Sequence, residues 1–176
     1  MNIKKELEEQ LIHELNNMLV DAGFNAKVLK DDNRNTSILE LHITNVGDRE
    51  DNHIIEIMFL PASEEFVEQN GFNILQIFAS MGEKTSIDCC NELARSVLKI
   101  NRILPNCSYG VDEKTKTLYY KSNCIITDNM SMSSAKALIE VQLGLYLSFL
   151  AKYNDVLMDM IDGNRTAKDA IKKGLI

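Results

Sequence analysis

The sequence has few cysteines and histidines, and they form no metal-binding motif. Its four cysteines include no CxxC pair, and its three histidines lack a spacing such as HxxxH. Cys89 and Cys90 are adjacent in a predicted helix, so their side chains point in different directions and cannot share one face of a site. We therefore expect no metal, and we expect Cys89, Cys90, Cys107 and Cys124 to be reduced and mostly buried.

Long apolar runs and strong positive charge are also lacking. Nowhere do about 18 apolar residues follow one another, and the basic N-terminus precedes no apolar segment. The 19 basic and 26 acidic residues give a net charge of -7, with no basic cluster larger than the pairs Lys4–Lys5 and Lys172–Lys173. We therefore expect a cytoplasmic protein that binds neither membrane nor nucleic acid.

Motifs of nucleotide binding and of hydrolysis are missing as well. The chain contains no GxGxxG, GxxxxGK[ST] or GxSxG sequence. Its turn carboxylates, such as Asp48, Glu50 and Asp51, are expected to be solvated. An enzyme would need a site assembled in space from residues such as Cys107 and His42. This alternative stays open, but we expect a protein that is not an enzyme.

What the sequence does contain is a clear alternation of helix and strand patterns. Apolar residues recur every three to four positions from Ile3 to Ala22 and indicate an amphipathic helix that ends at Gly23. The period then changes to two, which predicts strands over residues 25–32, 36–46, 53–62 and 72–81. Short polar turns join these strands, so they form an antiparallel meander.

The second half repeats this change of period. Residues 84–104 have helical spacing, with Ser86 as cap and Pro105 as stop, and an apolar stripe that includes Leu93, Ala94, Val97 and Leu98. A hairpin over residues 107–126 follows, with a turn at residues 113–116. A long helix over residues 128–162 and a short C-terminal helix complete the chain.

These elements predict an α+β fold in the order α-β-β-β-β-α-β-β-α-α, an antiparallel sheet with helices packed on it. A length of 176 residues suits one domain. We expect that domain to span residues 1–161, with residues 162–176 as a helical extension.

Between residues 138 and 150 the long helix is apolar on nearly every side, and one sheet cannot cover all of it. Its own core, a second subunit or a partner must cover the remainder. The residues expected to contact a partner or a second copy of the chain are Leu138, Val141, Gln142, Leu145, Tyr146 and Phe149.

The segment LARSVLKINRILPNCSYGVDEKTKTLYYKSNCII, between the meander and the long helix, resembles the YbjN-like family, described as bacterial sensory transduction regulators. The likeness covers about residues 1–157; residues 64–70 and 164–176 depart from the family pattern. It implies a fold like that of type III secretion chaperones and a non-enzymatic protein, often dimeric, that binds a polypeptide without a cofactor. The residues that carry it are Asn101, Leu104, Pro105, Tyr109, Val111, Asp112, Leu118 and Tyr120.

We therefore expect a protein-binding or adaptor module that forms a homodimer, with a regulatory role open. The alternatives are an enzyme with a spatially assembled Cys/His site and a structural dimer without a partner protein.

Overall fold

The helices and strands follow the predicted order. A computed structural model describes residues 3–31, 36–61, 65, 69–82, 87–112 and 114–176. The predicted cap Ser86 and the turn residue Glu113 lie outside these ranges. The helices are α1 (Ile3–Asp21), α3 (Ile87–Asn101), α4 (Met132–Ile161) and α5 (Ala167–Lys172). The strands are β1 (Asn25–Asp31), β2 (Thr36–Val46), β3 (Asp51–Phe59), β4 (Phe72–Met81), β5 (Cys107–Val111) and β6 (Leu118–Thr127).

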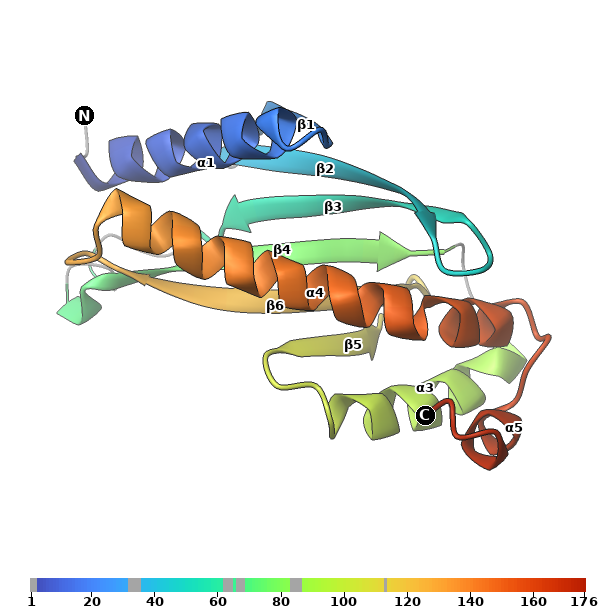
Figure 1. The fold of residues 1–176 in the computed structure, drawn as a ribbon. Helices are drawn as coiled ribbons and strands as arrows, with labels where there is room; N and C mark the ends of the chain where they lie inside the picture. The colour runs from blue at the N-terminus through green and yellow to red at the C-terminus, as the bar shows by residue number, and fades with distance from the viewer. Residues whose placement is uncertain (1–2, 32–35, 62–64, 66–68, 83–86, 113) are drawn as a thin grey trace. The chain divides into compact units, whose positions relative to one another are not determined.

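The six strands form one antiparallel sheet in the order β1-β2-β3-β4-β6-β5 (Figure 1). Leu29 of β1 pairs with Ile38 of β2, Ile57 of β3 with Ile77 of β4, and Tyr109 of β5 with Tyr120 of β6. The predicted α+β class and the predicted order of elements are thus confirmed.

The chain divides into two compact units. Unit 1 contains Met1–Ile43, Ile54–Phe78 and Asn123–Gly144, and unit 2 contains Thr44–His53, Ala79–Ser122 and Leu145–Ile176. Strands β2, β3, β4 and β6 and the helix α4 contribute residues to both units. The predicted extension, residues 162–176, belongs to unit 2. The single domain expected over residues 1–161 stays a prediction.

Unit 1 has an aliphatic core between helices and one face of its strands. Alternate strand residues point to the same side of a sheet, so the apolar residues at every second position face the helices together. Figure 1 shows α1 in front of β2, and the first half of α4 in front of β4. An ion pair joins the two helices, with Lys136 Nζ 2.9 Å from Glu14 Oε2. The buried residues include Leu11, Leu15, Leu39, Leu41, Ile55, Ile57, Leu75, Ile77, Ile139 and Leu143.

Unit 2 has an aromatic core. Tyr120 of β6 stacks between Tyr109 and Tyr146, with ring centroids 4.1 and 4.2 Å apart, and Tyr153 meets Tyr109 edge to face at 6.5 Å. The Tyr146 hydroxyl donates to the carbonyl oxygen of Tyr120 (2.9 Å), and the Tyr109 hydroxyl to that of Phe149 (3.2 Å). Burial raises the pKa of Tyr109, Tyr120 and Tyr146 well above the usual range.

Two residues of the helix–hairpin segment hold it in place through backbone hydrogen bonds. The Asn101 side-chain amide donates to the carbonyl oxygen of Tyr109 (2.8 Å), and its oxygen accepts from the Tyr109 N–H (2.9 Å). The Asp112 carboxylate accepts from the N–H groups of Lys114 and Thr115, and the bond from the Thr115 N–H is the main reason for its lowered pKa. Asn101 thus ties the end of α3 to β5, and Asp112 closes the hairpin turn.

The apolar stripe predicted on α3 is partly wrong. Leu93 and Val97 are buried as expected, but Ser96 and Ile100 complete the buried face, while Ala94 and Leu98 are exposed. Ser96 fits inside because its hydroxyl donates to the carbonyl oxygen of Glu92 (3.0 Å). The helix therefore presents a different face to the core, and Leu98 lies on the surface.

Candidate functional site

The six predicted contact residues of α4 fall into three groups. Val141 and Leu138 are exposed, by 64% and 38%; Leu145 and Phe149 are half-buried; Gln142 and Tyr146 are buried. Tyr146 is a member of the aromatic core of unit 2, so it is not free to contact a partner. Whether the other residues contact one stays a prediction.

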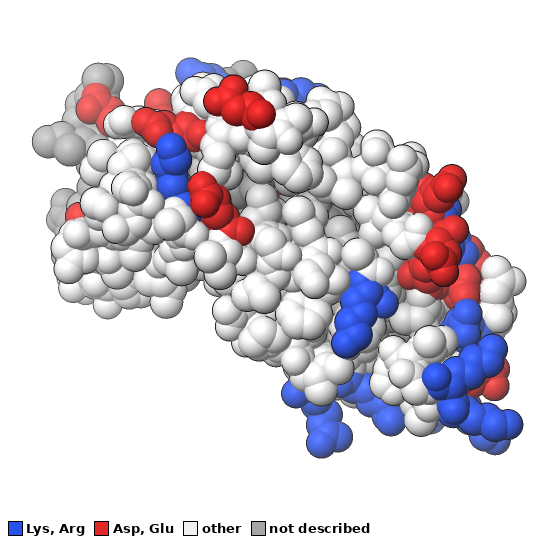
Figure 2. Space-filling view, in the orientation of Figure 1, with Lys and Arg blue, Asp and Glu red and all other residues white. Residues whose placement is uncertain are grey.

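The helical period explains this division. Ile139, Leu143, Tyr146 and Leu150 recur at intervals of three and four and form the buried face of α4. Leu138 and Val141 lie away from that face, and Figure 2 shows that the surface over α4 is largely uncharged. By length and composition alone α4 would suffice to cross a bilayer, but core helices of soluble proteins also meet this criterion. Of the most apolar 18 residues of α4, 33% are buried.

Opposite its helix-covered face, the sheet of unit 1 has a second face that carries apolar side chains beside polar ones such as Glu40 and Glu56. We call it the open face; its residues occupy the strand positions that alternate with the buried ones. Leu29 of β1 pairs with Ile38 of β2. Phe78 of β4 pairs with Glu56 of β3. Ile54 precedes Glu56 by two residues, so it lies on the same face. On β6, the neighbour of β4, Asn123 accepts a hydrogen bond from the Gln76 side chain (3.1 Å), which places Ile125 on this side as well. The apolar residues of the open face are Leu29, Ile38, Ile54, Ile74, Phe78 and Ile125.

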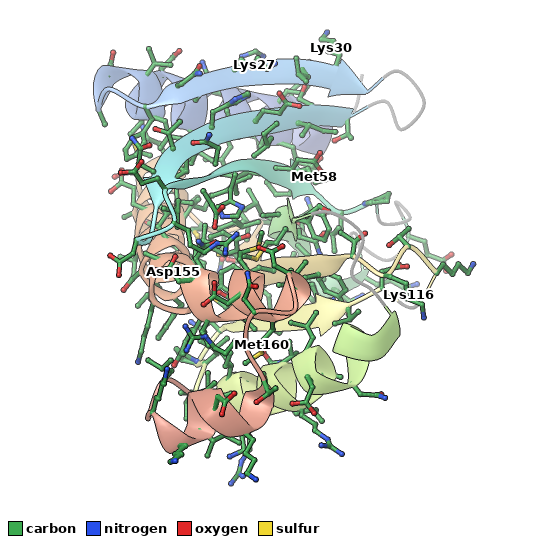
Figure 3. The ribbon with its side chains drawn as sticks, turned by 90° about the vertical axis from the view of Figure 1, so that its right-hand side faces the viewer. Lys27, Lys30, Met58, Lys116, Asp155 and Met160 are labelled. Carbon is green, nitrogen blue, oxygen red and sulfur yellow. The ribbon has the colours of Figure 1, made fainter. Side chains whose placement is uncertain are left out.

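The open face is exposed in part. Ile125, Ile54 and Leu29 are 56%, 48% and 39% exposed, and Ile38, Ile74 and Phe78 are half-buried. Met58 of β3, labelled in Figure 3, shares their strand parity and is buried. Among the described residues of unit 1, the helices α1 and α4 pack on the opposite side of these strands. Exposed apolar residues gathered on one face of a sheet are typical of a surface that contacts another protein.

Charged groups border the open face near the edge of the sheet. Lys27 Nζ of β1 lies 2.9 Å from Glu40 Oε2, and His42 Nε2 lies 3.6 Å from the same oxygen. The hydrogen bond from Lys27 is the main reason for the lowered pKa of the Glu40 carboxyl. Lys27 and Lys30 lie along β1, the outermost strand of the sheet order (Figure 3). Lysines on an edge strand disfavour further strand pairing, so the apolar face is the better candidate for contact.

The turn between β2 and β3 is bound to the second half of α4. Asp48 and Glu50 are exposed, as expected of solvated carboxylates, but Asp51 is paired with Arg49. Arg49 contacts Asp51 (3.1 Å), Asp159 (3.0 Å) and Asp162 (2.8 Å). Burial alone would lower the pKa of Arg49, but hydrogen bonds to these three carboxylates raise it further than burial lowers it. The charges are paired within unit 2, so this cluster stabilises the turn.

Further bonds hold the same turn. The Asp155 carboxylate accepts from the Asp48 N–H (2.8 Å), and a Cβ on Gly47, whose φ is +70°, would lie 2.0 Å from its Oδ1 atom. The buried Asn154 donates to the Val46 carbonyl oxygen (3.2 Å) and lies 2.8 Å from His53 Nε2. Figure 3 shows Asp155 next to this turn.

The residues considered for an enzymatic site have other surroundings. Cys107 and Cys124 are free and buried, and burial raises the pKa of Cys124. A raised pKa keeps the thiol protonated and unreactive at neutral pH. Cys107 lies in unit 2 and His42 in unit 1, where it neighbours Glu40. The side chains of Cys89 and Cys90 lie outside the described part of the chain.

Within the described ranges, no three His, Cys, Asp or Glu side chains are grouped so as to hold a metal ion. The part of the chain that the structure describes thus defines an α+β protein with an apolar surface on its sheet. No protein-family model matches the chain, and a search of curated proteins finds no relative.

Proposed function

We propose that this chain is a non-enzymatic protein-binding or adaptor module, cytoplasmic and homodimeric, whose open face holds a partner polypeptide. The observation that carries the proposal is the open face itself, on which the apolar side chains of Ile54 and Ile125 are about half exposed. Covering such a surface removes apolar area from water and gains roughly 25 cal/mol per Å².

The homodimer is assigned to α4. Val141 and Leu138 lie one helical turn apart on a part of α4 that belongs to unit 1, and both are exposed. Two copies of this helix can bury these residues against each other around a two-fold axis, as in most homodimers. The resemblance to the YbjN-like family supports this proposal, since those proteins are often dimeric and have the same order of elements.

Site-specific photo-crosslinking in living cells tests both contacts. A photoreactive amino acid replaces Ile54 or Ile125 on the open face and Val141 on α4. Lys116, which is partly exposed in the β5–β6 turn, is the control position. We expect Val141 to give an adduct of about twice the 19.9 kDa chain, and Ile54 and Ile125 to give adducts with another protein.

The two parts of the proposal can fail separately. Open-face adducts no stronger than those at Lys116 would remove the partner-binding function. A monomer mass by light scattering, together with no self-adduct at Val141, would remove the homodimer. Steady substrate turnover by the purified chain that needs Cys107 would restore the enzymatic alternative.

A further inference from the structure

The charge of this acidic protein is unevenly distributed. Seven of its 19 Lys and Arg residues, but only Glu92 and Asp169 of its acidic ones, lie within residues 91–104 and 164–176. These two segments carry +5, and the remainder of the chain carries -12, which together give the net charge of -7. Figure 2 shows the basic side chains gathered over α3 and α5 of unit 2. A local positive field of this kind attracts acidic partners.

A groove lies between α3 and α5 in this basic region. Its volume is about 590 Å³, within the range of natural binding clefts, and it is open to solvent. The two helices are joined at one end by a hydrogen bond from the Ala167 N–H to Glu92 Oε2 (2.8 Å). The lining residues are Glu92, Arg95, Leu98, Lys99, Thr166, Ala167, Lys168 and Ile171.

The groove combines apolar contact with basic borders. Leu98 is 68% exposed, the highest value among the exposed large apolar residues of the described chain. Ile171 of α5 lines the same groove. Arg95 makes one long contact with Glu92, 3.4 Å, and is 75% exposed. Among the described ion pairs, none involves Lys99 or Lys168. These cations are therefore available to a partner at little cost.

We propose that the groove between α3 and α5 binds an acidic amphipathic helix of a partner protein. Apolar side chains spaced three and four residues apart on such a helix contact Leu98 and Ile171, as in other helix-in-groove complexes. Glutamates or aspartates on both sides of that stripe pair with Arg95, Lys99 and Lys168. The inference names a partner chemistry for the proposed protein-binding function and rests on it, but it uses residues outside the open face.

Two other occupants fit the groove less well. An anionic membrane surface would need a convex apolar face, whereas Leu98 and Ile171 line a concave one. A nucleic acid would gain from the cations but not from exposed aliphatic side chains, because single strands stack on aromatic ones.

Fluorescence anisotropy with designed peptides tests the inference. The probe is a labelled peptide of roughly 16 residues, about four helical turns, with leucines along one face and glutamates beside them. One control peptide replaces every glutamate by lysine, and a second has the acidic composition but no apolar face. We expect the acidic amphipathic peptide to bind. We expect its affinity to fall at least about tenfold when the salt concentration rises from about 50 to about 300 mM.

Protein variants locate the binding site. We expect Lys99→Glu, Lys168→Glu and Leu98→Ser each to weaken binding about tenfold. Lys30→Glu, the same charge reversal on exposed β1, should leave binding unchanged. All four positions are exposed, so circular dichroism spectra should match the wild type.

Four results would overturn the inference: no binding of the acidic peptide, equal binding of the basic one, equal loss in Lys30→Glu, or binding only to phosphatidylserine vesicles or single-stranded DNA. Crosslinks at Ile54 and Ile125 are scored in a separate experiment. If the peptide does not bind but those crosslinks form, only the inference about the groove is wrong. If the peptide binds but the crosslinks do not form, only the proposal about the open face is wrong.

Discussion

The two units bury different kinds of core. In unit 1, aliphatic side chains such as Leu41, Ile55 and Ile77 are buried beneath the helices. In unit 2, three tyrosine rings stack, and an arginine joins three carboxylates around a turn. Aliphatic packing tolerates exchange among similar shapes, whereas stacked rings and charge clusters depend on particular partners. Single substitutions should therefore lower the free energy of unfolding more in unit 2 than in unit 1.

The largest effect should come from the tyrosine stack. Tyr146→Ala removes a fully buried ring and its contact with Tyr120, and we expect it to lower the free energy of unfolding by about 3–5 kcal/mol in urea titrations. Tyr146→Phe removes only the hydroxyl that donates to the Tyr120 carbonyl oxygen, so its cost should be about 1 kcal/mol. Equal costs would show that the hydrogen bond, and not the ring, matters.

The arginine cluster should come second. Arg49 is partly exposed, so Arg49→Ala should cost about 2 kcal/mol near pH 7, less than a fully buried pair. Burial would raise the pKa of Asp159, but hydrogen bonds from Arg165 and Arg49 outweigh it and lower that pKa. A carboxyl group whose pKa is lower in the folded state than in the unfolded state stabilises the fold at pH values above the unfolded-state pKa, about 3.9 for Asp.

That contribution is lost as the pH falls through the folded pKa of Asp159. The difference in unfolding free energy between wild type and Arg49→Ala should therefore shrink below about pH 4. A difference that stays constant from neutral to acidic pH would contradict the role of charge and leave only lost packing.

Two glycines provide a smaller, matched test. Gly47 and Gly23 both have positive φ, but only at Gly47 would a Cβ overlap another group, the Asp155 carboxylate. Gly23→Ala should cost about 1 kcal/mol from backbone strain alone, and Gly47→Ala about twice that. Thermal unfolding of the two variants measures the difference, and an equal loss would show that Asp155 moves aside freely.

The smallest effect is expected on the open face. Ile125→Thr replaces an apolar, half-exposed residue by one with a similar strand preference, and its free energy of unfolding should stay within about 0.5 kcal/mol of the wild type. The buried Ile77→Val of the neighbouring strand should cost about 1 kcal/mol. A larger loss at Ile125 would mean that the open face is already covered within the chain.

Periodicity predicted the fold well because each element has one dominant pattern. Leu39 and Leu41 lie two positions apart in the strand predicted over residues 36–46, and both are buried. On α3 the pattern was ambiguous, because Leu98 and Ile100 are both apolar and only the packed partner decides which is buried. The sequence did not reveal the open face, although "HIIEIMF" and "FNILQIF" are apolar at both parities, a possible signal.

Long-range polar contacts could not be predicted from spacing. Arg49 and Asp159 are 110 residues apart in sequence, and nothing near either residue indicates the other. The groove between α3 and α5 combines segments that are similarly distant, although the excess of basic residues in both segments can be read from the sequence.

The tyrosines of unit 2 also make this unit optically distinct. The chain has no tryptophan, and its five tyrosines, at positions 109, 119, 120, 146 and 153, all belong to unit 2. Intrinsic fluorescence and near-ultraviolet dichroism of tyrosine therefore report on unit 2 alone, while far-ultraviolet dichroism reports on the whole chain. Since β2, β3, β4, β6 and α4 contribute to both units, the two signals should change at the same urea concentration if the chain unfolds as one cooperative body.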